Sequence, residues 1–302
     1  LIAMGYIAAR TGYLPKALGD SLGAFAAKLA VPMLLSTAMM RLDLASAFSL
    51  PVLVSFYTGA LTCFIVGITL ARTLFGRTPG EAVAFGFAAT FSNSVLLGVP
   101  IVERAFGTDT LEIAFGIIAL HAPSLYTIGM ITMEMMRRDG KTIGETLAKA
   151  GRSIIVNPLM VGIVFGLAVN LSGMPLPEPV MAPLSMLAMA AIPAALVGMG
   201  ATLTQYKLTA DPVETLTAAS LSIILHPLIA FVMAYWVFDL PREAVLAVVG
   251  IAAMPPGVNI YIFASLYQRA VGLAASALLI ATVLSVLTIS GWLYALKLAG
   301  LS

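Results

Sequence analysis

The sequence predicts an all-α membrane protein in which ten transmembrane helices form two inverted repeats of five. Three observations support this fold class: the apolar composition, a series of apolar runs of membrane-spanning length, and short motifs that recur in both halves. Of the 302 residues, 60% are hydrophobic and 10% are charged, and the mean hydropathy is +1.02. Soluble domains contain roughly 45–50% apolar and about 25% charged residues. The composition therefore predicts a multi-pass membrane protein.

Apolar runs divide the chain into ten predicted spans, because a bilayer core about 30 Å thick needs roughly 20 apolar residues per helix. Their ranges are 1–9, 21–40, 49–71, 81–102, 111–135, 153–171, 180–200, 213–237, 243–267 and 271–297. The first range covers only about 14 Å and the chain begins with Leu, so we expect the N-terminal part of this helix to be missing. No small-residue cleavage site follows a charged segment, so this range does not resemble a signal peptide.

Basic residues predict the orientation of the spans. Loops after odd-numbered spans carry Arg10, Lys16, Arg72, Arg77, Arg137, Arg138, Lys141, Lys149, Arg152, Lys207 and Arg269. The opposite side carries Arg41, Arg104, Arg242 and Lys297. Because basic loops stay in the cytoplasm, the odd-numbered loops are predicted to be cytoplasmic and both termini to lie outside. Glu81, Glu243, Glu103 and Arg104 lie at span ends and are expected to be interfacial caps.

Short motifs relate the two halves of the chain. "PGEAV" at 79–83 recurs as "PREAV" at 241–245, and "RAFG" at 104–107 recurs as "RAVG" at 269–272. Each half has five spans, an odd number, so the second half must enter the membrane from the opposite side, which defines an inverted repeat. The predicted division is a first repeat at 1–136, a polar cytoplasmic linker at 137–152 and a second repeat at 153–302.

The fourth and ninth spans are interrupted at similar depths. They read "FSNSVLLGVPI" from 91 and "MPPGVNIYIFA" from 254, and the residues that break the helices are Gly98, Pro100, Pro255 and Pro256. An unpaired backbone group costs several kcal/mol in lipid, so a break persists only against protein or a water-filled cavity. Paired breaks in inverted repeats predict a transporter binding site, where half-helix N-termini attract an anion.

Three stretches resemble the auxin efflux carrier family, whose bacterial members include malonate and malate permeases. They are "FSNSVLLGVPIVERAFG" at 91–107, "NPLMVGIVFGL" at 157–167 and "AMPPGVNIYIFASLYQ" at 253–268. The resemblance implies that helices four and nine cross at their breaks near the membrane centre. It also implies an elevator-like carrier, in which a transport domain slides against a scaffold of the first, second, sixth and seventh helices. The implied location is a bacterial inner membrane, with a homodimer formed through the scaffold.

Sodium-coupled bile acid carriers share this fold and provide the alternative function. Those carriers hold sodium with a Glu and a Gln in the ninth-helix break and a Ser-Asn pair in the fourth. Here Ser92 and Asn93 retain the second element, but "PPGVN" at 255–259 offers no carboxylate. Sodium coupling is therefore disfavoured, although backbone carbonyls and hydroxyls could still hold an ion.

The candidate substrate-binding residues are Asn93, Ser92, Ser94, Asn259, Gly257 and Pro256 at the breaks, together with His121 in the fifth span. A buried amide must be hydrogen-bonded, so each Asn either contacts substrate or caps a half-helix. The serines also fit a simple packing role, since small polar side chains let membrane helices approach.

Two histidines lie inside predicted spans. His121 is a candidate for proton coupling, because an ionisable group within the membrane marks a functional site and His titrates near neutral pH. The alternative is a neutral His bonded to a carbonyl freed by Pro123. For His226, in "LHPLI", the structural interpretation is favoured.

No sequence pattern indicates catalysis or a cofactor. The chain lacks G-x-S-x-G, H-E-x-x-H and P-loop motifs, and Cys63 is its single cysteine, which excludes disulfides and Cys metal sites. No basic, aromatic-rich surface predicts nucleic-acid binding. The expected function is secondary transport of a small carboxylate, with no enzyme activity, metal or cofactor. A membrane receptor or an intramembrane enzyme on the same fold is a further alternative.

Overall fold

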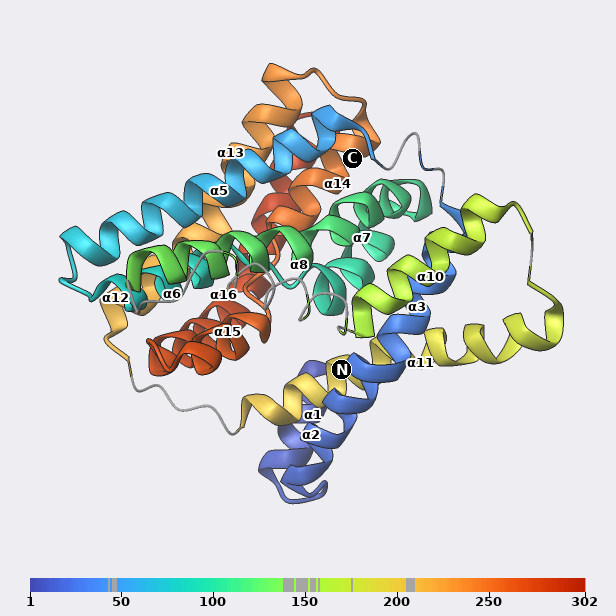
Figure 1. Ribbon diagram of the computed structural model, residues 1–302, viewed down its shortest axis with the longest axis horizontal. Coiled ribbons are helices and arrows are strands. Elements are labelled where there is room, and N and C mark those ends of the chain that lie inside the picture. The colour runs from blue at the N-terminus through green and yellow to red at the C-terminus, as the bar shows by residue number, and fades with distance from the viewer. Residues whose placement is uncertain are drawn as a thin grey trace. The chain divides into compact units, whose positions relative to one another are not determined.

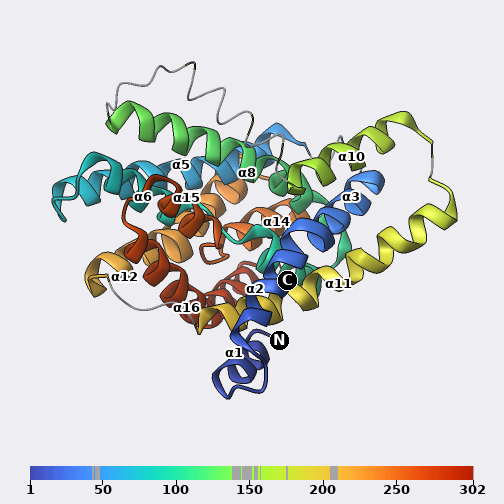
Figure 2. The same ribbon diagram turned by 60° about the horizontal axis from the view of Figure 1, so that its bottom comes forward.

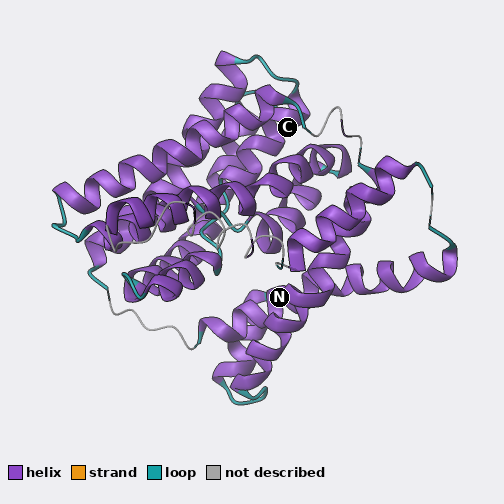
Figure 3. Cartoon of the chain, viewed as in Figure 1, coloured by secondary structure: helices purple, strands orange, loops and turns teal. Residues whose placement is uncertain are grey.

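The computed structural model describes residues 1–42, 44, 48–137, 144, 152, 156, 158–174, 176–204 and 210–301. Every regular element in this part of the chain is a helix (Figure 3). The predicted all-α class is therefore confirmed. The predicted linker at 137–152 falls outside the described residues, apart from the end of one helix and residues 144 and 152.

The chain forms two compact units, each built from segments that are distant in sequence. The first unit comprises Leu1–Asp43 and Arg152–Tyr206, and the second comprises Leu44–Gly151 and Lys207–Ser302. In Figure 1 the first unit joins the blue helices of the N-terminus to the yellow helices of the chain's middle. Each unit therefore draws on both predicted repeats.

The first unit contains five described α-helices and one π-helix. Their bounds are α1 Ile2–Arg10, α2 Lys16–Phe25, η1 Ala26–Ala30, α3 Val31–Arg41, α10 Pro158–Ser172 and α11 Glu178–Leu203. Helices α3 and α10 pack closely, because Gly162 and Gly166 present no side chain at the contact. A Cβ at either glycine would lie 2.3 Å from a carbonyl oxygen of α3, that of Pro32 or Ser36. This is the small-residue contact typical of membrane helices.

The second unit holds the remaining helices. Their bounds are α5 Leu50–Thr73, α6 Pro79–Thr90, η2 Ser94–Gly98, α7 Val99–Phe106, α8 Thr108–Arg137, α12 Pro212–Ser220, η3 Leu221–Leu225, α13 His226–Phe231, η4 Val232–Val237, α14 Arg242–Ala252, α15 Asn259–Tyr267 and α16 Val271–Leu298. Figure 2 shows α5, α6 and α8 side by side. The chain is buried throughout Ala82–Ser94 and Ala244–Gly257, which places both interrupted segments inside this unit.

The described helices occupy all ten predicted spans. Six are long and apolar enough to cross a membrane: Ala17–Arg41, Leu50–Thr73, Thr108–Met136, Glu178–Leu203, Pro212–Val237 and Val271–Leu298. The others are the short α1 and α10 and the two interrupted spans, one formed by α6, η2 and α7 and the other by α14 and α15. A multi-pass membrane protein is confirmed, while the count of ten crossings and the inverted repeat stay predictions.

Three π-helical turns precede prolines. Pro32, Pro100 and Pro227 each lie two residues after the end of η1, η2 or η3. A proline lacks an N–H, and its ring collides with the carbonyl four residues earlier, which falls inside the π turn in each case. The residue before each proline instead bonds to the carbonyl five residues back, as the N–H of His226 does to Leu221. The helices thus continue past these prolines with a local bulge.

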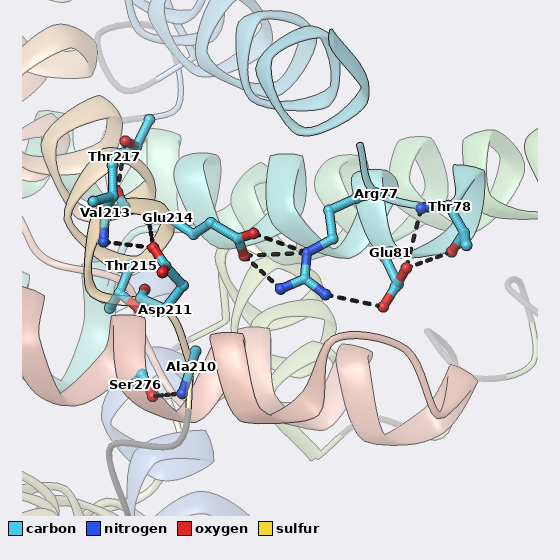
Figure 4. Close-up of polar contacts among 10 residues, drawn as sticks. All are labelled: Arg77, Thr78, Glu81, Ala210, Asp211, Val213, Glu214, Thr215, Thr217 and Ser276. Atoms are coloured by element: carbon cyan, nitrogen blue, oxygen red, sulfur yellow. Dashed lines mark hydrogen bonds and ion pairs between the residues drawn. The ribbon is translucent and has the colours of Figure 1, made fainter. Parts of the chain in front are cut away.

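A charged network ties the loop after α5 to the start of α12 (Figure 4). Arg77 Nη2 donates to Glu214 at 2.7 Å and Nε donates to both Glu214 oxygens at 3.1 Å. Arg77 Nη1 also contacts Glu81 at 3.4 Å. Glu81 in turn accepts from the backbone and hydroxyl of Thr78, which completes a capping box at the start of α6. Glu81 therefore caps the start of α6, while its position at the membrane interface stays a prediction.

Candidate substrate-binding site

The predicted breaks are real interruptions of helical geometry. Helix α6 ends at Thr90, and Phe91 adopts an extended conformation before η2 begins at Ser94. Helix α14 ends at Ala252, and helical geometry resumes at Asn259. Each break therefore lies directly before the N-terminus of a new helical segment, where backbone N–H groups give a partial positive potential.

The two breaks are hydrogen-bonded to each other through their backbones. Asn93 N donates to Pro255 O at 2.8 Å, and Gly257 N donates to Phe91 O at 3.2 Å. These bonds form an isolated antiparallel bridge between Ser92 and Pro256. Segments from opposite halves of the chain thus satisfy one another's backbone groups, which is the condition for irregular backbone at membrane depth.

Gly257 allows the close approach of the two breaks. A Cβ at this position would lie 3.3 Å from Asn93 Cα and 3.4 Å from both Asn93 Cβ and Cγ. Asn93 is only 6% exposed, and its side chain makes no capping bond to the helix that follows. Its backbone oxygen instead accepts from the N–H groups of Leu97 and Gly98. Its amide therefore lies against the facing break.

The remaining break residues have structural positions. Ser92 and Ser94 are both buried. Gly98 packs beneath Ile251 of α14, where a Cβ would lie 2.9 Å from Ile251 Cδ1. Pro100 lies in the first turn of α7, and Pro255 and Pro256 form the irregular segment that pairs with the first break.

Tyr126 of α8 fixes the orientation of Asn259. The Tyr126 hydroxyl donates to Asn259 Oδ1 at 3.1 Å. Because the amide oxygen is engaged, the Nδ2 group remains as the donor that this side chain offers to a ligand. Sequence reasoning did not select Tyr126. The signal that could have identified it is its position five residues after His121 in the same polar stretch.

His121 contacts the first break directly. Its Nε2 atom lies 3.2 Å from the carbonyl oxygen of Ser92 and 3.5 Å from Ser92 Oγ. The side chain is 1% exposed. The structure thus brings His121 to the first break, where it contacts the backbone and hydroxyl of Ser92.

Four aromatic side chains cover the breaks, and we call Phe87, Phe91, Tyr126 and Phe263 the aromatic cluster. Phe87 stacks on Phe263 with ring centroids 4.0 Å apart, and Phe91 lies 5.5 Å from Tyr126. Phe91 also contacts His121 edge-on at 4.6 Å. Aromatic carbon around polar groups lowers the local dielectric constant, so hydrogen bonds at the breaks are strengthened.

A separate cavity of about 350 Å³ lies in the first unit. It is bordered by Met40, Arg41, Val169, Asn170, Gly173, Met174, Leu176 and Met181. Asn170 Nδ2 donates to the carbonyl oxygens of Met39, Met40 and Leu42, so this side chain ends α3. None of the candidate substrate residues borders this cavity. Among the described residues, no group of three or more His, Cys, Asp or Glu side chains is placed to hold a metal.

Comparison with known proteins identifies the family. Residues 1–293 match the family described as membrane transport protein. The chain belongs to this membrane transport protein family. The "Putative malonate transporter" of Rhizobium meliloti is 27% identical over 310 residues, which cover 98% of this chain and 93% of the relative. An "Uncharacterized transporter" of Methanothermobacter thermautotrophicus is 24% identical over 300 residues, 97% of this chain and 94% of that protein.

A third relative is an animal protein of different length. The "Lysosomal cholesterol signaling protein" of Mus musculus is 27% identical over 185 residues, which cover 56% of this chain but 21% of the mouse protein. The family assignment expected from the sequence, an auxin efflux carrier relative, is confirmed by the family match and the nearly full-length relatives. This family member is a membrane transporter and not an enzyme.

Proposed function

We propose that this chain is a secondary transporter that moves a small carboxylate across the membrane, with the anion bound where the two breaks meet. The observation that carries the proposal is the backbone pairing of the breaks, Asn93 N to Pro255 O and Gly257 N to Phe91 O. It gathers two half-helix N-termini at one buried place. The name of the Rhizobium relative makes malonate the first substrate to test.

Neutral groups recognise the anion in this proposal. No Lys or Arg occurs in 82–103 or 244–268, the sequence that spans both breaks. The Asn93 and Asn259 amides, with the Ser92 and Ser94 hydroxyls beside them, provide donors, and the helix N-termini add partial positive charge. The aromatic cluster limits access of water.

The division into units supports an elevator-like mechanism. The first unit holds the helices at the first, second, sixth and seventh predicted spans, the set that the family resemblance implies for the scaffold. The second unit holds both breaks and would carry the bound anion. We also propose the inner membrane as location, with both termini outside and a homodimer through the first unit, as the charge pattern and the resemblance imply.

A screen of carboxylates tests the proposal. Purified protein is heated with malonate, malate, pyruvate or acetate, each with sodium or potassium as the cation, and is also reconstituted for uptake. A ligand that binds only the folded state stabilises it by about 2.7 kcal/mol at a hundred times its Kd, so we expect a raised Tm and saturable uptake for at least one acid in either cation. A strict sodium requirement would support the bile-acid-carrier alternative. Absence of both binding and uptake for every acid would contradict the proposal.

Tyr126→Phe is expected to weaken malonate binding about fivefold. The substitution removes one neutral hydrogen bond, worth roughly 1 kcal/mol, that orients the Asn259 amide. Tyr57→Phe is the matched control, because the Tyr57 hydroxyl bonds to Ile117 O in the same unit. Titration of both variants with malonate measures the effect. Equal affinities for the two variants would show that Tyr126 does not position Asn259 for binding.

A further inference from the structure

Both histidines of the chain contact one phenylalanine inside the second unit. The ring centroid of His121 lies 5.5 Å from that of Phe56, and the ring centroid of His226 lies 4.8 Å from it. The two side chains are 1% and 0% exposed. The chain has no other histidine, so its whole complement of imidazoles is gathered in one buried layer.

The hydrogen bonds of these imidazoles define their tautomers. His121 Nε2 lies 3.2 Å from Ser92 O, and His226 Nε2 lies 3.4 Å from Phe56 O. A carbonyl oxygen only accepts, so each Nε2 carries the hydrogen and each Nδ1 holds a lone pair. Both Nδ1 atoms are buried and have no hydrogen-bond partner among the described residues. Two proton acceptors are thus left open in the same layer.

The position of His226 is built by its neighbours. A Cβ at Gly59 of α5 would lie 2.8 Å from both His226 Cδ2 and His226 O, so α5 leaves space for this imidazole. The π turn η3 ends directly before His226. The hydroxyl of Ser222, four residues earlier, is also buried without a partner in the described part of the chain. Unpaired buried polar atoms are where internal water or a proton is accommodated.

Within the described part of the chain, no carboxylate competes for a proton in this layer. The other titratable side chains there are Tyr57 and Cys63 on α5 and Tyr126 on α8, which donate to Ile117 O, Leu221 O and Asn259 respectively. Tyr235 lies on the adjoining η4. Charged groups of the packed helices lie near helix ends or in loops: Arg72, Arg77, Glu81, Glu103, Arg104, Asp109, Glu112, Glu134, Arg137, Glu214, Arg242, Glu243, Arg269 and Lys297.

We propose that His121 and His226 form one shared proton-binding site that couples a proton gradient to carboxylate movement. A proton delivered by hydronium binds the Nδ1 lone pair of either imidazole, which leaves water and one imidazolium. A second proton is opposed by the first charge in the same buried layer. The pair therefore takes up one proton in each cycle. The coupling part of this inference rests on the proposed transport function, whereas proton binding by the two histidines can be tested separately.

The pair is linked to the substrate site through Ser92. Protonation of His121 at Nδ1 converts Nε2–H into a charged donor to Ser92 O, and charged donors make stronger hydrogen bonds. Ser92 is the bridge residue that pairs with Pro256. Because coupling between two sites is reciprocal, proton uptake changes the stability of the paired breaks, and anion binding at the breaks changes proton affinity.

Histidine-selective ¹⁵N NMR tests the proton site without any transport assay. Protein carrying a histidine-free affinity tag, in lipid nanodiscs, gives imidazole signals from these two residues only. At about pH 8 we expect two Nε2–H tautomers, and on acidification to about pH 5 with malonate we expect uptake of one proton, shared between them. In His226→Gln the titration of His121 is expected to shift. Nδ1–H tautomers, no titration, or an unchanged His121 titration in the variant would each overturn the proposal.

Proteoliposomes test the coupling. For His226→Gln we expect the ratio of gradient-driven malonate accumulation to malonate counterflow to fall by at least about tenfold. Cys63→Ala, which removes another buried side chain of this layer, should keep the wild-type ratio. A wild-type ratio in His226→Gln would overturn the proposal. If the wild type shows malonate counterflow but a proton gradient drives no accumulation, the proposal is also overturned, while carboxylate transport stands. If no acid is transported at all, the proposed function is contradicted instead.

Discussion

Arg77→Ala is expected to lower the free energy of unfolding by about 3 kcal/mol, because it leaves a buried carboxylate without its cation. The Glu214 side chain is 8% exposed, while the Arg77 side chain is 32% exposed. Hydrogen bonds from Arg77 to Glu214 raise the pKa of the guanidinium above its ordinary value, against the effect of burial. The pair also joins the loop before α6 to the start of α12 (Figure 4), so both helix starts lose support.

Removal of the other partner, Glu214, should lower the free energy of unfolding by less. In Glu214→Ala the guanidinium keeps its contact with Glu81 and partial access to solvent, so we expect a loss of about 1–2 kcal/mol. Glu243→Ala is the matched control, because its partner Arg242 is 52% exposed and such pairs are worth about 0–1 kcal/mol. Denaturant unfolding followed by tryptophan fluorescence measures all three. A larger loss for Glu214→Ala than for Arg77→Ala would contradict this explanation.

Much of the fold was predictable because the determining signals are local. Apolar runs fixed the helices closely: the span predicted at 213–237 lies within a helical segment from Pro212 to Val237. Proline and glycine located both breaks, since their effects on the backbone do not depend on distant residues. The family resemblance implied that the two broken helices meet at their breaks, and the backbones of the breaks do pair.

The side-chain contacts around the breaks were not predictable from the sequence. Tyr126 meets Asn259 across 133 residues, and His226 meets Phe56 O across 170 residues. Such contacts depend on which face each helix turns inward. Helices that are apolar on all sides give no amphipathic stripe from which to read that face. No local signal therefore indicated that His226 would contact Phe56 O or that the aromatic cluster would gather at the breaks.

The division into two units was not predictable from the sequence either, because it also depends on which helix faces meet. The repeat pattern divides the chain at its middle, whereas the compact units exchange helices between the halves. Packing of α10 against α3 depends on Gly162 and Gly166 facing α3. Glycines are common throughout this chain, which has 26 of them, so their presence alone does not predict a partner. Only the family resemblance implied which helices group together.

Asn93→Ala and Asn259→Ala are each expected to weaken malonate binding by roughly ten- to a hundredfold. Loss of one hydrogen bond to a charged group costs about 1.5–3 kcal/mol, which corresponds to that range of affinity. Asn93 lies buried against Gly257 in the facing break, and Tyr126 orients Asn259. Ligand-free thermal stability should change less than affinity, because Asn93 makes no capping bond to the segment that follows it, and Asn259→Ala removes one neutral hydrogen bond from Tyr126, worth roughly 1 kcal/mol.

Calorimetric titration of malonate into the wild type and these two variants tests directly whether the anion binds where the breaks meet. Asn170→Ala is the control, since Asn170 ends α3 in the first unit by bonding three backbone carbonyls. We predict that Asn170→Ala lowers the Tm and keeps wild-type affinity, while the two break variants lose affinity and lower the Tm less than Asn170→Ala does. Wild-type affinity in Asn93→Ala and Asn259→Ala, together with a fall in their Tm like that of Asn170→Ala, would contradict the account and place the anion elsewhere.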